Sequence, residues 1–113
     1  MVKFKVRATQ KETWRYIAFS VFSEAKPSKN NIIHTITSSI LQLFGEAGAS
    51  ETNVWLIDYN KEKKKGILRC SNKALTEVLG ALTAITSINK KKASVTTLGV
   101  SGTIKKLKKK HFN

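Results

Sequence analysis

Acidic residues are scarce in this chain. It has 7 Asp and Glu against 21 Lys and Arg, which gives a formal net charge of +14 on 113 residues. Such a charge repels itself and is usually compensated by a polyanion. Nucleic acid is therefore the first candidate partner, and an anionic membrane surface is the second. The few carboxylates are also scattered, so no pair is spaced for two-metal or general acid–base catalysis.

Cysteine and long apolar runs are also nearly missing. The single Cys70 cannot form an internal disulfide, which fits a reducing compartment, and we expect a cytoplasmic protein. No apolar run reaches the roughly 18 residues of a transmembrane helix. The first residues alternate charged and apolar side chains and lack the apolar core of a signal peptide. We therefore expect no membrane partner.

Residues suited to catalysis or metal binding are few. His34 falls inside a predicted helix, where a lone histidine is usually structural. No Cys/His spacing resembles a zinc site. Cys70 has basic neighbours, but it ends a predicted strand and is expected to pack as a small apolar residue. We predict no catalytic residue, no metal site and no cofactor bound by the protein itself.

The apolar content, in contrast, suffices for a folded globule. Hydrophobic residues make up 41% of the chain, and 113 residues suit a single domain. Residue patterns predict strands at 14–22, 52–59, 66–70 and 93–98. Helical spacing of apolar residues predicts one helix that ends at Phe44 and a second one over 72–85. A short final helix has one turn of apolar anchor, Ile104 and Leu107.

The predicted element order is βαββαβ followed by a helix. This is the split βαβ plan, and right-handed crossovers place both long helices on one sheet face. We predict an α+β, ferredoxin-like (RRM-like) two-layer sandwich with an antiparallel sheet and a short basic C-terminal helix. One domain spans 1–113, with a basic arm at 1–13 and the basic helix and tail at 103–113.

Several local boundaries follow from residue type. Asn30 or Asn31 is expected to cap the first helix. Gly45 is expected to end that helix, and Gly48 to continue the loop. The run Lys90–Lys92 reads as a basic loop before the last strand.

The sheet face away from the long helices is a candidate partner surface. The Lys65-Gly66 pair resembles the opening of the third strand of an RNA-recognition motif, but its stacking aromatics are missing, so base stacking there is not expected. Strand alternation places on this face Tyr16, Ala18, Leu56, Ile67 and Arg69. A half-apolar face suits a protein partner. The final helix could equally fold back and cover it, and the pattern alone leaves both readings open.

The end of the chain carries the strongest local signal. A glycine-bracketed turn, Gly99–Thr103, opens a segment dominated by lysine. Backbone N–H groups freed at a helix start, followed by clustered cations, suit a phosphate group. Ser101 or Thr103 is the expected cap. The basic candidates are Lys90, Lys91, Lys92, Lys105, Lys106, Lys108, Lys109 and Lys110.

Three stretches resemble a known family. They are WRYIAF at 14–19, GILRC at 66–70, and ALTAITSINKKKASVTTLGVSGTIKKLK at 81–108. The chain resembles the ribonuclease P protein component 2 family, the small protein subunit of archaeal ribonuclease P, with relatives in the eukaryotic ribonuclease P and MRP particles. The likeness spans about 14–110.

The resemblance implies a protein subunit of a ribonucleoprotein that removes the 5′ leader of precursor tRNA. It implies that the RNA subunit performs the hydrolysis with bound Mg²⁺, so this subunit is noncatalytic. The implied partners are the ribonuclease P RNA, precursor tRNA indirectly, a larger TIM-barrel-like protein subunit, and a second copy of this subunit in a two-plus-two assembly. The implied RNA contacts are 98–103 (Gly99, Ser101, Gly102 and Thr103 among them) with the lysines that follow, and Arg15 and Arg69.

Two rival functions differ in class. A general RNA-binding or ribosome-associated module would share the charge but not a preference for ribonuclease P RNA. A small phosphate-transfer enzyme on the same fold, like the acylphosphatases, would need an arginine in the loop after the first strand. That loop, 23–27, holds Glu24 and no arginine.

Overall fold

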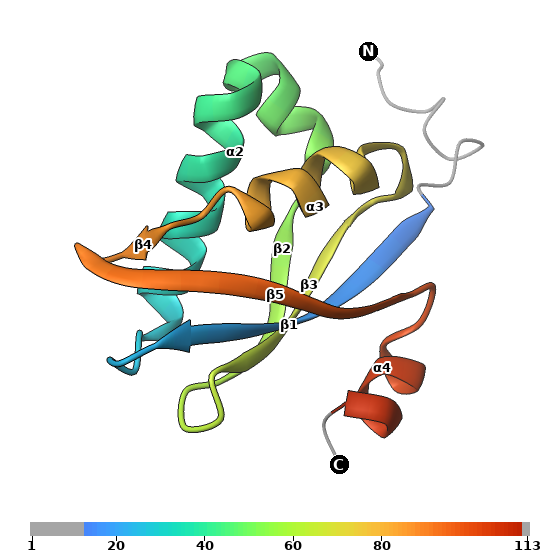
Figure 1. The fold of residues 1–113 in the computed structure, drawn as a ribbon. Helices are drawn as coiled ribbons and strands as arrows, with labels where there is room; N and C mark the ends of the chain where they lie inside the picture. The colour runs from blue at the N-terminus through green and yellow to red at the C-terminus, as the bar shows by residue number, and fades with distance from the viewer. Residues whose placement is uncertain (1–12, 112–113) are drawn as a thin grey trace.

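The fold is a sheet with helices on both faces (Figure 1). A computed structural model describes residues 13–111, so all of the predicted basic arm except Thr13 lies outside the described residues. The five strands are antiparallel in the order β2-β3-β1-β5-β4. The elements are β1 (Trp14–Ser23), α2 (Lys29–Thr52), β2 (Trp55–Asn60), β3 (Lys65–Ser71), the 3₁₀ turn η1 (Asn72–Ala74), α3 (Leu75–Thr83), β4 (Ser87–Ile88), β5 (Lys91–Ser101) and α4 (Ile104–His111). The predicted α+β ferredoxin-like class is confirmed. Within the described residues, no helix is long and apolar enough to cross a membrane.

The main core lies between the sheet and the two helices α2 and α3. Alternation along β1 sends Ile17, Phe19 and Val21 to this side, where all three are buried. The face of α2 that meets them repeats every four residues, with Ile32, Ile36 and Ile40. The prediction of the buried face of β1 is confirmed.

The boundaries of α2 differ from the prediction at both ends. Ser28, not Asn30 or Asn31, is the N-cap: its Oγ accepts from the Asn31 N–H at 3.2 Å, and Asn31 Oδ1 accepts from the Ser28 N–H at 3.3 Å. At the other end, Gly45 has φ 73° and ψ 178° and kinks the helix, but a further helical segment follows to Thr52. Gly48 is therefore helical, and the predicted loop was wrong.

A hairpin replaces the predicted basic loop at Lys90–Lys92. Ile88 pairs with Lys91 across a two-residue turn, Asn89 and Lys90, whose φ angles are 52° and 68°. Positive φ at both central residues matches the twist of a hairpin. Lys91 and Lys92 consequently belong to β5, which is longer at both ends than the predicted strand.

A register shift in β2 corrects the predicted open face. Leu56 pairs with Leu68 and Asp58 pairs with Ile67, so Ile57 is the extra residue of a bulge. Leu56 lies in the main core on the α2 side. The simple alternation that placed Leu56 on the opposite face was wrong, because the bulge puts both Ile57 and Asp58 on that face and leaves Leu56 on the core side.

The final helix α4 covers the middle of the other sheet face (Figure 1). Leu107 is 3% exposed and packs with Ala18 and Ile67, both fully buried. At the rim of this second cluster lie Tyr16, Ile57, Leu98 and Ile104. Of the two readings left open by the sequence, the covering helix is the one observed.

Candidate nucleic-acid interface

The helix α4 presents lysines around a single buried leucine. Leu107 faces the sheet, while Lys105, Lys106, Lys108 and Lys109 are exposed. Lys108 Nζ lies 3.4 Å from Asp58 Oδ2, an ion pair whose side chains are both about half exposed. Together with Lys110, which also belongs to α4, these residues are named the α4 lysines. Their clustering on one docked helix makes a dense cationic surface of the kind that phosphates neutralise.

The turn before α4 is shorter than predicted. Gly99 lies inside β5, opposite Ala18, so only Gly102 and Thr103 separate strand from helix. Thr103 Oγ1 accepts from the Lys106 N–H at 3.4 Å, and Ser101 Oγ accepts from the Thr103 N–H at 3.2 Å. Two of the backbone donors expected to hold a phosphate are therefore already bonded to side chains. The predicted attraction of a phosphate to the start of α4 therefore depends on the lysines rather than on free backbone N–H groups.

Arg15 lies beside this turn. A Cβ placed on Gly102 would stand 3.6 Å from Arg15 Nη1, and the same nitrogen donates to the Trp14 carbonyl at 2.9 Å. The structure thus brings Arg15, Ser101, Gly102 and Thr103 together at the start of α4.

Arg69 has surroundings that the sequence did not indicate. Its guanidinium carbon lies 3.9 Å from the centroid of the Trp14 ring, a cation–π contact. Arg69 also pairs with Tyr16 on β1 and with Trp55 on β2. The aromatic partners escaped prediction because they belong to neighbouring strands, and only the registers between strands reveal them.

The three lysines at the β4–β5 hairpin form a separate basic site. Lys90, Lys91 and Lys92 are exposed at the start of β5, while α4 follows its end. A strand rises about 3.3 Å per residue, so the ten steps from Lys91 to Ser101 span roughly 33 Å. The structure does not bring these lysines together with the α4 lysines. An RNA that contacts both sets must extend along the whole of β5.

The predicted protein-partner face is largely inaccessible in this chain. Ala18 and Ile67 are fully buried beneath α4, and Leu56 is on the other side of the sheet. Tyr16 alone of the four is partly exposed. The remaining open part of this sheet face is the end that carries Trp14, Trp55 and Arg69.

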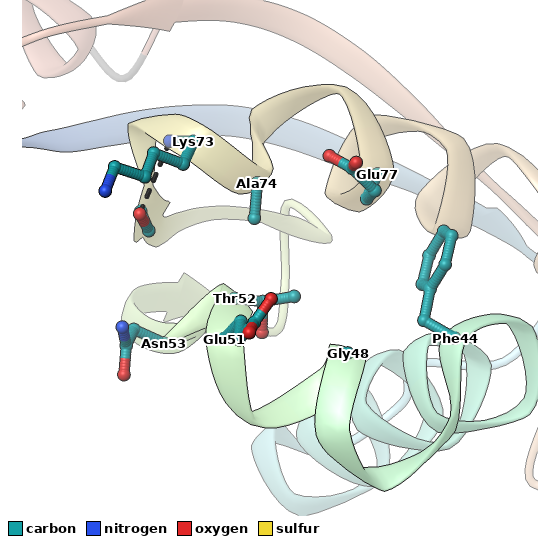
Figure 2. A pocket seen from close by; sticks show the side chains of 9 residues that line it. Phe44, Gly48, Glu51, Thr52, Asn53, Lys73, Ala74 and Glu77 are labelled. Carbon is teal, nitrogen blue, oxygen red and sulfur yellow. Dashed lines mark hydrogen bonds between the residues drawn. The ribbon is translucent and has the colours of Figure 1, made fainter.

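A cavity of about 560 Å³ lies on the helix side of the molecule, between the last turns of α2 and η1 with α3. Figure 2 shows Glu51 on the α2 wall and Glu77 on the α3 wall, with Phe44 at one end and Lys73 at the other. Two of the chain's few carboxylates therefore border this cavity against one lysine. The lining of this cavity is therefore less favourable to phosphate than the lysine surface of α4.

Cys70 is held as a buried thiol. It is fully buried in the main core, and burial raises its pKa to about 11. A thiol with this pKa does not supply a nucleophile at neutral pH. Among residues 13–111, no group of three or more His, Cys, Asp or Glu is arranged to hold a metal ion.

We expect Cys70 to be inert in the native protein. With the pKa near 11, about one thiol in a thousand is ionised at pH 8, and the fraction rises as pH increases. Ellman's reagent should therefore react slowly with the folded chain at pH 8 and rapidly after unfolding in urea. Rapid labelling of the folded protein would contradict the buried position of Cys70.

Comparison with known proteins places the chain in a family. The model of the Rpp14/Pop5 family matches residues 15–112. A protein of Pyrococcus furiosus named ribonuclease P protein component 2 is 40% identical over 105 residues, which cover 93% of this chain and 88% of that protein. Proteins of the same name from Pyrococcus abyssi and Methanosarcina mazei are 38% and 35% identical, over 93% and 85% of this chain and 89% and 81% of theirs.

A solved structure shares the fold. A chain in the cryo-EM structure of yeast ribonuclease MRP superposes with a TM-score of 0.69 at 10% identity, over 84% of this chain and 78% of that chain. The resemblance seen in the three sequence stretches is thus confirmed over most of the chain, and this protein belongs to the Rpp14/Pop5 family, whose archaeal relatives are named ribonuclease P protein component 2.

Proposed function

We propose that this chain is a noncatalytic protein subunit of ribonuclease P, the ribonucleoprotein that removes the 5′ leader of precursor tRNA. The observation that carries the proposal is the family match over residues 15–112, with relatives named as ribonuclease P components. The chain binds the catalytic domain of the RNA subunit and stabilises its active fold. Mg²⁺ is held by the RNA, which performs the hydrolysis, and no residue of this chain is assigned to it.

The proposed physical role is charge neutralisation at close-packed phosphates. A folded RNA brings phosphates near one another, and their repulsion opposes the active fold. The α4 lysines are point charges on flexible stems, so they can follow phosphates without the fixed geometry of an arginine fork. Their anchor at Leu107 keeps the charges on one side of the sheet. This arrangement supports a stabilising rather than a chemical role.

The proposed protein partner is the larger TIM-barrel-like subunit, with a second copy of this chain in a two-plus-two assembly in the cytoplasm. Since α4 covers the sheet, the helix layer offers the better protein-binding surface. A groove of about 310 Å³ between α2 and β2 is lined by Ile33, Ile36 and Val54. Leu41 and Leu43 are about half exposed on α2. Apolar surface of this kind supports a protein contact there.

Stepwise reconstitution tests this function. Precursor tRNA is incubated with the purified chain, the ribonuclease P RNA and the larger protein subunit, alone and in every combination, at one salt and Mg²⁺ concentration. The expected result is no leader removal by the chain alone and faster removal by the RNA when the chain and its partner are added. Leader removal by pure protein would overturn the noncatalytic role.

Binding specificity distinguishes a ribonuclease P subunit from a general RNA-binding module. The affinity for ribonuclease P RNA is compared with that for an unrelated structured RNA of equal length at matched salt. A clear preference for ribonuclease P RNA is expected. Equal affinities would favour the general RNA-binding module, because charge alone does not distinguish sequences or folds.

A further inference from the structure

Four side chains form one row across the sheet, on the face that α4 partly covers. Trp55 of β2 pairs with Arg69 of β3, Arg69 with Tyr16 of β1, and Tyr16 with Ser101 of β5. Directly paired residues of antiparallel strands project to the same side. Tyr16 packs in the cluster beneath α4, which fixes that side. This set of four is named the cross-strand row.

Arg69 is the fixed cation of the row. The Trp14 ring stacks against its guanidinium at 3.9 Å. Its Nε is buried and donates no hydrogen bond to any described residue. An unsatisfied buried donor is costly, and the cost is greater for a charged group. The nearest acid along β2, Asp58, is paired with Lys108 instead. The row therefore holds a positioned guanidinium whose Nε has no acceptor among the described residues.

Trp55 is the exposed aromatic of the row. Its side chain is 63% exposed on an edge strand, directly opposite Arg69. An exposed indole beside a cation is a stacking platform for single-stranded nucleic acid, because every base has a π-face. At its other end the row reaches Ser101, which only Gly102 and Thr103 separate from α4. A single-stranded RNA that lies along the row from Trp55 to Ser101 would therefore extend to the α4 lysines.

We propose that the cross-strand row binds an unpaired nucleotide of RNA, with the base stacked on Trp55 and an adjacent phosphate bound by Arg69. The inference rests on the proposed function and deepens it by naming the chemical class of the bound segment. Phosphate oxygens are acceptors that carry the opposite charge, which a stacked guanidinium without an acid partner requires. Trp55 also borders the apolar groove between α2 and β2, so a protein contact at this indole is the competing outcome.

Short oligonucleotides test the row directly. Binding of a labelled single strand of about 12 nucleotides, and of the same strand annealed to its complement, is measured with the full chain and its variants. Trp55→Ala should weaken single-strand binding roughly 5- to 150-fold, and Trp55→Phe should weaken it less, since an aromatic ring remains. Neither variant should alter duplex binding, whose bases are not free to stack on the indole. Phe44→Ala is the matched control: Phe44 is 37% exposed beside the cavity of Glu51 and Glu77 on the helix side, and its loss should leave the binding of both strands unchanged.

The salt dependence of binding distinguishes base stacking on Trp55 from phosphate binding by Arg69. Trp55→Ala should leave the slope of log K against log[salt] unchanged, while Arg69→Gln should reduce its magnitude by about 0.7, the value for one phosphate contact on a single strand. Wild-type binding of the single strand by Trp55→Ala, or an equal loss on the duplex, would overturn the proposal. Failure of the proposed function would appear elsewhere, as equal affinity for ribonuclease P RNA and an unrelated RNA. The two failures are therefore distinguishable.

Discussion

Replacing all five α4 lysines with glutamine should nearly abolish the salt dependence of binding to ribonuclease P RNA. If the wild-type chain neutralises about six phosphates, log K falls against log[salt] with a slope of roughly −4 to −5. Loss of the five charges should flatten the slope to about −1. The slope is measured by filter binding or fluorescence anisotropy over a salt series. An unchanged slope would remove α4 from the RNA interface.

The substitution keeps the helix while it removes the charge. Glutamine has nearly the helix propensity of lysine. Lys105 and Lys109 are four residues apart, and like charges at that spacing destabilise a helix, so their removal should not unfold α4. The Lys108–Asp58 pair is half exposed and contributes little. Lys73→Gln is the control, since Lys73 borders the acidic cavity on the helix side and its loss should leave the slope unchanged.

Gly66→Ala should be the most destabilising small substitution in the sheet. A Cβ at this position would lie 2.6 Å from the Phe19 Cζ and 2.9 Å from the Asp58 carbonyl oxygen. Phe19 is fully buried and the second neighbour is backbone, so neither can move away cheaply. We expect a loss of about 2–3 kcal/mol in the free energy of unfolding, the upper part of the range of about 1–3 kcal/mol for overpacked cores. Urea denaturation with wild-type m-values measures it.

Gly80→Ala should act in the opposite direction and serves as the matched variant. Gly80 lies inside α3, where an added Cβ meets no atom within 4 Å. Alanine in a helix interior is favoured over glycine by about 0.5–1 kcal/mol, so this variant should be more stable than the wild type. Wild-type stability of Gly66→Ala would show that the close contact at this position relaxes without cost.

The element order was predictable from the sequence because each long element carries its own periodicity. The apolar face of α2 repeats at helical spacing, and β1 alternates between buried and open sides. The short strand β4 was missed because it has only two residues, which carry no period. Its turn is Asn89-Lys90 rather than Asn-Gly, and the backbone of Lys90 adopts a positive φ against the usual preference of its residue type.

The positive charge of the candidate site was predictable from the sequence, but the arrangement of its side chains across the strands was not. The lysine run at the end of the chain pointed to α4, and Leu107 was expected to anchor it. The bulge at Ile57 and the cross-strand partners of Arg69 depend on registers between strands, which local patterns do not encode. The same limit explains the placement of Leu56 on the wrong face and the failure to predict the aromatic neighbours of Arg69.

The bulge in β2 limits the deletions that this strand can accept. Because of the extra residue, Ile57 and Asp58 both face α4, so one segment supplies an apolar contact and the Lys108 ion pair in succession. Deletion of Ile57 would leave Asp58 opposite Ile67 but would remove the apolar side chain that packs against the cluster beneath α4. The neighbouring 60–64 loop is exposed at its tip and tolerates insertions. Length differences among relatives should therefore collect in that loop and spare the strand.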